Sequence, residues 1–297
     1  MPIEVAIHHE TRYAYDRLVR LEPQTIRLRP APHGRTPIRS YSLRVEPAEH
    51  FLNWLQDPSG NYLARVVIPD PVHALHVTVD LVAEIGELDP FAFFVAEEAA
   101  DWPFVYESEM AEELFPLRVI HPPEARLAEW IASVPRTPVA TVDLLVELNQ
   151  RIHRTLEYQV RLEPGVQTPE ETLSLGRGSC RDSAWLLVVL LRHLGIAARF
   201  TSGYLIQLSP DDPAADRGDL HAWAEAYIPG AGWIGLDTTS GLLAGAGHLP
   251  LASSPRPQSA APISGRLGPC VVSFEHQIRV ERLAAAGVAP SGPPPAP

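Results

Sequence analysis

The stretch that decides the fold reads GRGSCRDSAWLLVVLL from Gly176 to Leu191. Two glycines precede Ser179 and Cys180, and an almost unbroken apolar run follows Ser183. Glycines allow tight turns, a serine can cap a helix, and a segment that is apolar nearly all round is typical of a buried helix. The stretch therefore predicts a loop and then a buried helix over residues 180–194, with Cys180 in its first turn.

A cysteine in this position is a candidate nucleophile. The free N–H groups and the macrodipole at a helix N-terminus favour an anion such as a thiolate, and the same N–H groups can receive the oxyanion of a tetrahedral intermediate. A free cysteine is otherwise often a small buried apolar residue. We assign that role to Cys270, between Pro269 and a predicted strand, and the reactive role to Cys180, among glycines and polar residues.

A base and a residue that orients it follow Cys180 in the sequence. His221 begins a strand-like segment that runs to Ile228, and Asp237 ends the next segment after a Pro-Gly-Ala-Gly turn. A hairpin-like pair of strands would bring the two side chains together. A histidine held by a carboxylate can protonate the amine that leaves a cleaved amide. Taken alone, His221 could equally be a surface histidine, but the three residues together predict a Cys180–His221–Asp237 triad.

Two blocks of sequence carry a family resemblance. GRGSCRDSAWLLVVLLRHLGIAARFTSGYL (176–205) and HAWAEAYIPGAGWIGLDTTSG (221–241) resemble the bacterial transglutaminase-like superfamily, whose members use a papain-like triad. The resemblance implies that Cys180 is the nucleophile, His221 the general base and acid, and Asp237 the orienting carboxylate. VQTPEETLSLG and the β-rich N-terminal region resemble the bacterial subgroup with an N-terminal β domain. The chain departs at Thr238, where the family often has proline, which affects the turn after the strand.

The resemblance also extends to neighbours of the triad. Arg181 and Asp182 match the motif and are expected to make structural hydrogen bonds. Tyr158 is a weak candidate for a second oxyanion donor. Trp223 and Trp233 are expected to pack beside the triad rather than to act chemically.

The remaining pattern predicts an α+β fold, a papain/transglutaminase-like core preceded by a β-sandwich or barrel-like domain. In the core, the helix that carries the cysteine should pack on an antiparallel sheet. Residues 3–87 form short β-branched and aromatic segments between turns, and their His8-His9 and His73/His76 pairs are expected to be solvated histidines of strands rather than metal ligands. We predict the remaining elements as follows: helices at 122–134 and 141–158, the second capped by Thr141, and strands at 198–207, 221–228, 233–237 and 271–280.

These elements divide the chain into four parts. We expect an N-terminal β-rich domain at 1–88, an acidic aromatic linker at 89–117, a transglutaminase-like catalytic domain at 118–285 and a disordered Pro-rich tail at 286–297. The linker should pack its aromatic residues and show its acids to water; the alternative is that the acids attract a cationic substrate or partner.

No cofactor or metal is predicted. The loop Asp211–Asp219 is acidic but lacks the alternating spacing and the final Glu of an EF-hand loop, so we expect it to be solvated. A Cys/His/Asp metal site would have only three ligands, without a supporting CxxC or HxxxH motif. An ATP- or nucleotide-using ligase is not predicted, because the sequence contains no P-loop.

Composition argues against several classes of protein. The formal net charge of −12 argues against nucleic-acid binding. The lack of a long uncharged apolar stretch argues against a membrane span, and the acidic, alternating N-terminus is unlike a signal peptide, so we expect a cytoplasmic protein. Two cysteines are too few for a disulfide framework. All 24 basic residues are arginine, which reflects compositional bias or, alternatively, avoidance of self-modification at lysine.

The sequence therefore predicts an enzyme that attacks peptide or isopeptide amide bonds of a peptide or protein substrate through a thioester acyl-enzyme. Hydrolysis, as in a protease or amidase, is favoured. The alternatives are transfer to an amine, as in a protein-glutamine transamidase, and a binding or assembly module of the same fold without activity. The oligomeric state is left open.

Overall fold

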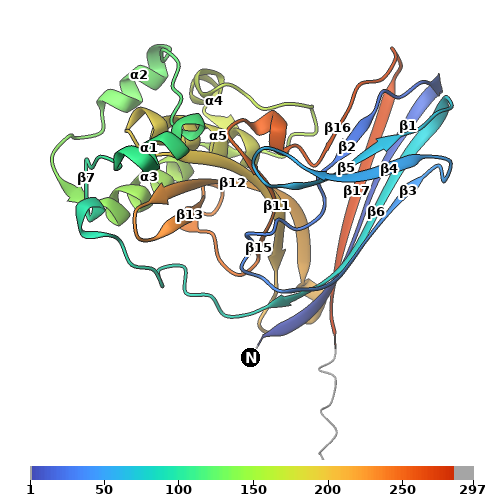
Figure 1. The fold of residues 1–297 in the computed structure, drawn as a ribbon, viewed down its shortest axis with the longest axis horizontal. Helices are drawn as coiled ribbons and strands as arrows, with labels where there is room; N and C mark the ends of the chain where they lie inside the picture. Colours follow the sequence, from blue (N-terminus) through green and yellow to red (C-terminus); the bar gives the residue numbers. More distant parts are fainter. Residues whose placement is uncertain (1, 284–297) are drawn as a thin grey trace, which may run out of the picture.

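A five-stranded antiparallel sheet with the strand order β14-β13-β12-β11-β15 forms the centre of the protein. In the computed structural model, which describes residues 2–283, the helices lie on one side of this sheet and the strands of the N-terminal region on the other (Figure 1). The predicted tail at 286–297 lies outside the described residues. The strands of the sheet are β11 (Ala198–Gln207), β12 (Arg217–Ile228), β13 (Gly232–Asp237), β14 (Leu242–Leu243) and β15 (His248–Ser254).

Helix α5 (Cys180–His193) packs on β12 and β11, as the sequence predicted. Leu186, Leu187, Leu190 and Leu191 are fully buried. Each leucine side chain that leaves water contributes roughly 1.5–3 kcal/mol to the stability of the fold, so this helix is firmly held. The other helices are α1 (Ser108–Glu113), α2 (Ala125–Ala132), α3 (Thr141–Thr155) and α4 (Pro169–Leu175), with short 3-10 turns η1 (Glu97–Ala99), η2 (Phe115–Leu117), η3 (Pro213–Ala215) and η4 (Pro257–Ala260).

The predicted helices are shorter than expected, since α2 and α3 do not fill 122–134 and 141–158 and residues 157–158 form the strand β9. Two further details differ from the prediction. Thr141 does not cap α3; the N-cap is Ala140, and the buried Thr141 hydroxyl donates to the carbonyl of Ala99 at 2.6 Å. Helix α4 was not predicted. Its start carries a capping box, in which Thr168 and Glu171 each accept a hydrogen bond from the other's backbone N–H.

The N-terminal region forms two four-stranded sheets with the orders β17-β1-β6-β3 and β16-β2-β5-β4. Burial alternates along the first strand, where Val5 and Ile7 face the interior, because side chains alternate across a strand. This interior is continuous with Tyr204 and Leu249 of the central sheet. The strands are β1 (Ile3–Val19), β2 (Gln24–Ile26), β3 (Ile38–Glu46), β4 (Phe51–Gln56), β5 (Tyr62–Val67), β6 (Val72–Ile85), β16 (Ile263–Ser264) and β17 (Val272–Arg282).

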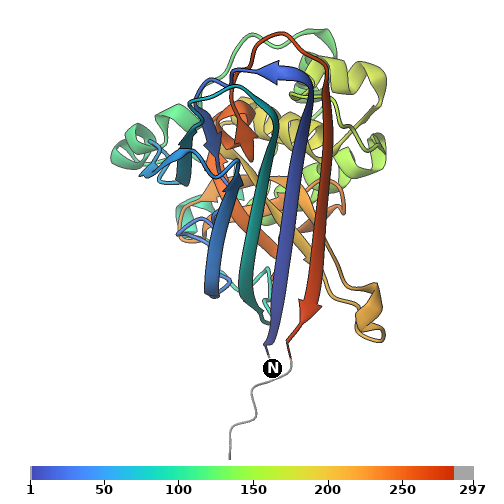
Figure 2. The same cartoon turned by 90° about the vertical axis from the view of Figure 1, so that its right-hand side faces the viewer.

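The position of the last strands corrects the predicted division of the chain. The strand expected at 271–280 is present as β17, but it pairs with β1, from Val5 opposite Arg282 to Tyr15 opposite Val272. Figure 2 shows β17 as the outer strand beside β1. Likewise β16 pairs with β2. A local pattern can predict a strand but not its partner, so these residues were assigned to the 118–285 unit although they complete the sheets of the N-terminal region.

The prediction that the histidines of the N-terminal strands are solvated is wrong for His9. This ring is 1% exposed and lies between the hydroxyls of Tyr204 at 2.8 Å and Thr11 at 2.9 Å. Burial lowers its pKa to about 4, so the ring is neutral at pH 7. His9 thereby links β1 to the central sheet.

The predicted linker is more ordered than expected, since it contains η1, α1 and the short strand β7 (Asp101–Trp102), which pairs with β8 (Val139–Ala140). Trp102 and Tyr106 are buried and donate hydrogen bonds to the carbonyls of Leu194 and Tyr227. Phe94, however, is 89% exposed. Among residues 2–283, no helix is long and apolar enough to cross a membrane.

Candidate active site

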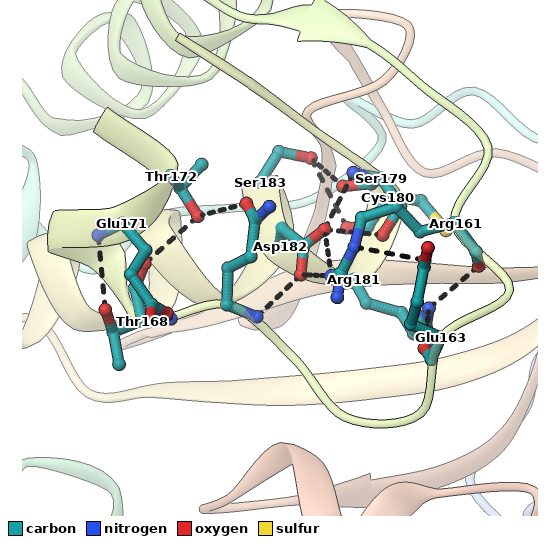
Figure 3. Close-up of polar contacts among 11 residues, drawn as sticks. Arg161, Glu163, Thr168, Glu171, Thr172, Ser179, Cys180, Arg181, Asp182 and Ser183 are labelled. Atoms are coloured by element: carbon teal, nitrogen blue, oxygen red, sulfur yellow. Dashed lines mark hydrogen bonds and ion pairs between the residues drawn. The ribbon is translucent and has the colours of Figure 1, made fainter. Parts of the chain in front are cut away.

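Cys180 is the first residue of α5 and lies in a rigid setting. The N–H and the hydroxyl of Ser179, the N-cap residue, both donate to Oδ2 of Asp182 at 2.8 Å (Figure 3). Cys180 is 9% exposed. Because the capping interactions fix the first turn, they also fix the direction of the sulfur and of the N–H groups around it.

Asp182 holds the loop in front of the helix. Its fully buried carboxylate accepts both hydrogen bonds of Arg161 Nη1, at 2.7 and 2.8 Å, and one from the Gln167 N–H at 2.8 Å. Burial alone would raise the pKa of Asp182, but the bond to Arg161 and those to backbone N–H groups lower it. Arg181 reaches back from the helix to the carbonyls of Arg161 and Glu163 (Figure 3). Both residues therefore make the structural hydrogen bonds that the sequence predicted.

The structure brings His221 and Asp237 together. β12 and β13 are antiparallel neighbours, and His221 Nε2 lies 3.0 Å from Asp237 Oδ1. Burial alone would lower the pKa of His221, but its hydrogen bonds to Asp237 and to Cys180 outweigh burial and raise it to about 10. The predicted base is thus a protonated imidazole at neutral pH that contacts the predicted nucleophile.

Both carboxylate oxygens of Asp237 are fully engaged. Oδ1 also accepts the Thr239 N–H at 2.9 Å, and Oδ2 accepts the Ser240 hydroxyl at 2.9 Å and faces His248 Nε2 at 3.4 Å. Burial on its own would raise the pKa of Asp237, but the hydrogen bonds from His221 and His248 hold it well below its usual range. A carboxylate with this many donors stays ionised and cannot rotate.

His248 is the member of the site that sequence reasoning missed. The Gly245 N–H donates to its Nδ1 at 3.1 Å, so that nitrogen has no proton and the ring hydrogen lies on Nε2, which points at Asp237. The ring also packs edge-on against Trp223, with centroids 5.1 Å apart. His248 begins β15, which pairs with β11, and β15 was not predicted. The sequence therefore gave no signal for it.

Three further side chains tie the Asp237 turn to the helices. Thr238, where the family often has proline, is buried and donates to the Ser183 hydroxyl at 2.8 Å, one turn into α5. Asn149 of α3 donates to the carbonyls of Asp237 and Leu242 at 3.3 and 3.0 Å. The departure at Thr238 thus supplies a direct link between the strand that carries the acid and the helix that carries the cysteine.

Of the two tryptophans expected beside the triad, Trp223 lies there, whereas Trp233 packs against Tyr227 and Arg199 instead. Trp223 stacks on His221 with centroids 6.4 Å apart and donates to Glu225, so it packs beside the triad. Tyr158 is half exposed on β9 (Glu157–Tyr158), which pairs with β10 (Arg177–Gly178) just before Cys180. Partial burial, and then the charges of Cys180, Asp219 and Asp237, raise its pKa. Its hydroxyl therefore keeps the proton that an oxyanion donor needs, and that role stays a prediction.

Potential metal ligands gather at one place in the described part of the chain. His221, Asp237 and His248 each offer a ligand atom within 4.8 Å of the others. The acidic loop Asp211–Asp219 does not gather in this way: Asp216 is bound by Arg282 at 2.6 Å, and Asp211 and Asp219 are exposed. Three protein ligands and one open position would suit catalytic zinc. A metal site, if present, would therefore lie at His221, Asp237 and His248 rather than in the Asp211–Asp219 loop.

Two protein-family models match separate regions of the chain. The model of the bacterial transglutaminase-like N-terminal region matches residues 5–84, and the model of the transglutaminase-like superfamily matches residues 127–238. An uncharacterized protein of Mycobacterium tuberculosis is 28% identical over 253 residues, 79% of this chain and 78% of that protein. An uncharacterized protein of Mycobacterium leprae is 24% identical over 250 residues, 78% and 81% of the two chains.

One solved structure matches almost throughout. A candidate cysteine protease from Cytophaga hutchinsonii superposes with a TM-score of 0.63 at 17% sequence identity, covering 96% of this chain and 92% of its own. At this identity the match establishes the fold. It includes the N-terminal β region, the helix that carries the cysteine and the central sheet in one arrangement.

Proposed function

Because the chain belongs to the transglutaminase-like superfamily, with the bacterial N-terminal region, we propose that it is a cysteine-dependent hydrolase of peptide or isopeptide amide bonds. The observation that carries the proposal is the buried His221, which is hydrogen-bonded to Asp237 at 3.0 Å and lies near enough to Cys180 for that residue to raise its pKa. A nucleophile, a base and an orienting carboxylate in contact form the arrangement that acyl transfer requires. A binding module without activity would not need to keep these three buried side chains together.

In the proposed first step the Cys180 thiolate attacks the amide carbonyl carbon and forms a C–S bond. The carbonyl oxygen becomes an oxyanion, which the N–H groups at the start of α5 can receive. His221 gives the proton on Nδ1 to the amine nitrogen as the C–N bond breaks, and a thioester remains. Asp237 keeps the imidazole turned toward both the sulfur and the leaving nitrogen.

In the second step His221 takes a proton from water, and the resulting hydroxide attacks the thioester carbonyl. The C–S bond breaks, the carboxylic acid leaves, and the thiolate and the protonated imidazole are restored. A primary amine in place of water would give a transamidase. Water needs no binding site of its own, whereas an amine acceptor needs a second pocket that holds it and keeps water out, and for this reason we propose hydrolysis.

The choice of acceptor has a direct test. An amide that the enzyme turns over is supplied together with a dansylated primary amine at millimolar concentration, and both products are quantified. We expect the free acid to dominate. Since the chain contains no lysine, its own side chains do not compete as lysine acceptors. Dominant incorporation of the dansylated amine would replace the hydrolase by a transamidase and leave the nucleophile unchanged.

The pH dependence of the rate follows from the raised pKa of His221. The proposed active form carries a protonated imidazole, and a raised pKa means that this form persists to higher pH. The rate should therefore fall only as pH approaches about 10, where His221 loses its proton, and not near 6.5. The measurement is kcat/KM between pH 5 and 10.5, with circular dichroism to verify the fold. A basic limb near pH 6.5 would show that His221 is not held as proposed.

A metal-dependent hydrolase is the second candidate, because the ligand atoms of His221, Asp237 and His248 lie within 4.8 Å of one another. In our proposal hydrogen bonds, not a metal, join these residues. Excess EDTA should therefore leave the rate unchanged. His248→Phe, which removes one donor to Asp237, should lower kcat on the order of tenfold, as loss of a positioning hydrogen bond does.

The control is His73→Asn, a change at an exposed histidine of β6, which should keep the full rate. If EDTA abolished activity and added zinc restored it, the metal assignment would be correct. Activity lost completely in His248→Phe, with an intact fold, would point the same way.

A further inference from the structure

A cavity lies at the C-terminal end of α5, remote from the triad. Its volume is about 610 Å³, which falls within the usual range for small-molecule sites. It is lined by residues at the starts of α2 and α4 and by residues of the C-terminal half of α5 and of η4. Arg192, one of these α5 residues, follows Cys180 by twelve residues, or about 18 Å along the helix, so the two sites are separate.

Apolar side chains and prolines form much of the lining of the cavity. Trp185 and Val189 of α5 line it together with Leu127 and Ile120. Several of the residues that line it are prolines, whose rings fix the backbone, so the cavity is largely formed before a ligand arrives. A preformed site loses little conformational entropy on binding. The prolines are Pro116, Pro122, Pro123, Pro169 and Pro255.

The α5 wall carries positive charge that the protein does not neutralise. Arg192 is 7% exposed and donates to the carbonyls of Ala198 and Pro255, which are neutral acceptors. Within residues 2–283 no carboxylate lies at ion-pair distance from Arg192 or from the neighbouring, exposed Arg256. Burial, and then Arg256, lower the pKa of Arg192 to about 10, so it stays cationic at neutral pH. A buried charge without a counterion is costly.

The acids of the cavity lie on the wall formed by the starts of α2 and α4, and the Glu124 side chain makes no capping hydrogen bond there. Glu170 accepts hydrogen bonds from the N–H groups of Arg126 and Leu127 at the start of α2, at 3.1–3.2 Å. Glu124 is the N-cap residue of the same helix, where the macrodipole favours a negative charge. Both acids thus belong to this wall, and the two arginines remain without an anion.

We infer that this cavity binds a small molecule with an apolar chain and one carboxylate, of the class of medium-chain fatty acids. The carboxylate lies between Arg192 and Arg256, and the chain packs along Trp185 and Val189. Such a ligand supplies the missing counterion and fills the apolar walls at the same time. The inference does not rest on the proposed hydrolase activity, because none of these residues belongs to the triad.

Isothermal titration calorimetry on the whole chain tests this with octanoate, and with octanol and octylamine as matched probes that lack the carboxylate. Octanoate should bind at one site, at least about tenfold more tightly than octanol, and octylamine should not bind. Arg256→Glu, a change at an exposed residue, should weaken octanoate by about tenfold or more. Val189→Trp should block the cavity, and Cys180→Ala should bind octanoate like the wild type.

Equal affinity for octanoate and octanol would overturn the inference, as would octanoate binding that Arg256→Glu leaves intact. If Val189→Trp failed to fold by circular dichroism, the Arg256→Glu result would still decide. An apolar tetrapeptide with a free C-terminus that bound more tightly than octanoate would assign the cavity to a peptide rather than a small molecule.

Discussion

Cys180→Ala should abolish turnover, with a loss in kcat on the order of 10⁴ or more, and should leave the fold nearly unchanged. The alanine removes only the sulfur. The helix start is held by Ser179, Asp182 and Arg161, none of which depends on the thiol. The measurements are steady-state kinetics on an amide substrate, with circular dichroism and cooperative melting of the same preparation.

The matched control is Cys270→Ala, which changes the other free cysteine. Cys270, which was expected to be buried, is only half-buried and more exposed than Cys180; it has no part in the proposed mechanism, so this variant should keep the full rate. If Cys180→Ala remained active while folded, the nucleophile would have to be sought elsewhere.

Asp237→Asn should lower kcat by up to about 10⁴, by analogy with the loss of the carboxylate in serine-protease triads. The amide cannot hold the protonated imidazole of His221 as the carboxylate does, so the basic limb of the pH profile should also move from about 10 toward 6.5. The asparagine carbonyl oxygen can still accept the Thr239 N–H, and its NH2 group can donate to the Ser240 hydroxyl, so the fold should survive. The measurement is kcat and KM across pH.

Asp211→Asn provides the control, since this exposed acid lies in the loop before β12 and the change removes the same charge. Its kinetics should match those of the wild type. Wild-type kcat/KM in Asp237→Asn would remove Asp237 from the triad.

Local sequence predicted those parts of the site that depend on local structure. The glycines and the cap before Cys180 fix a helix start whatever the rest of the chain does, and the short turn between β12 and β13 brings His221 to Asp237 without a long-range contact. The apolar character of α5 is equally local, because a helix without a polar face has to be buried.

What could not be predicted depends on contacts between distant segments. His248 reaches Asp237 only because β15 pairs with β11, and β17 pairs with β1 across almost the whole length of the chain. His9 is buried because Tyr204 of another sheet covers it. The hydrophobic pattern of a strand indicates which of its faces is buried but not which strand lies beside it, so these pairings could not be predicted from the sequence.

The central claim is that Cys180 forms a thioester with the acyl group. The most direct measurement is mass spectrometry of enzyme quenched in acid after brief exposure to p-nitrophenyl acetate, a small activated ester that needs no knowledge of the natural substrate. We predict one acetyl group per chain, on the peptide that contains Cys180, removed by hydroxylamine and absent in Cys180→Ala. Ester hydrolysis without acetyl on Cys180, or acetylation of the more exposed Cys270 instead, would contradict the account.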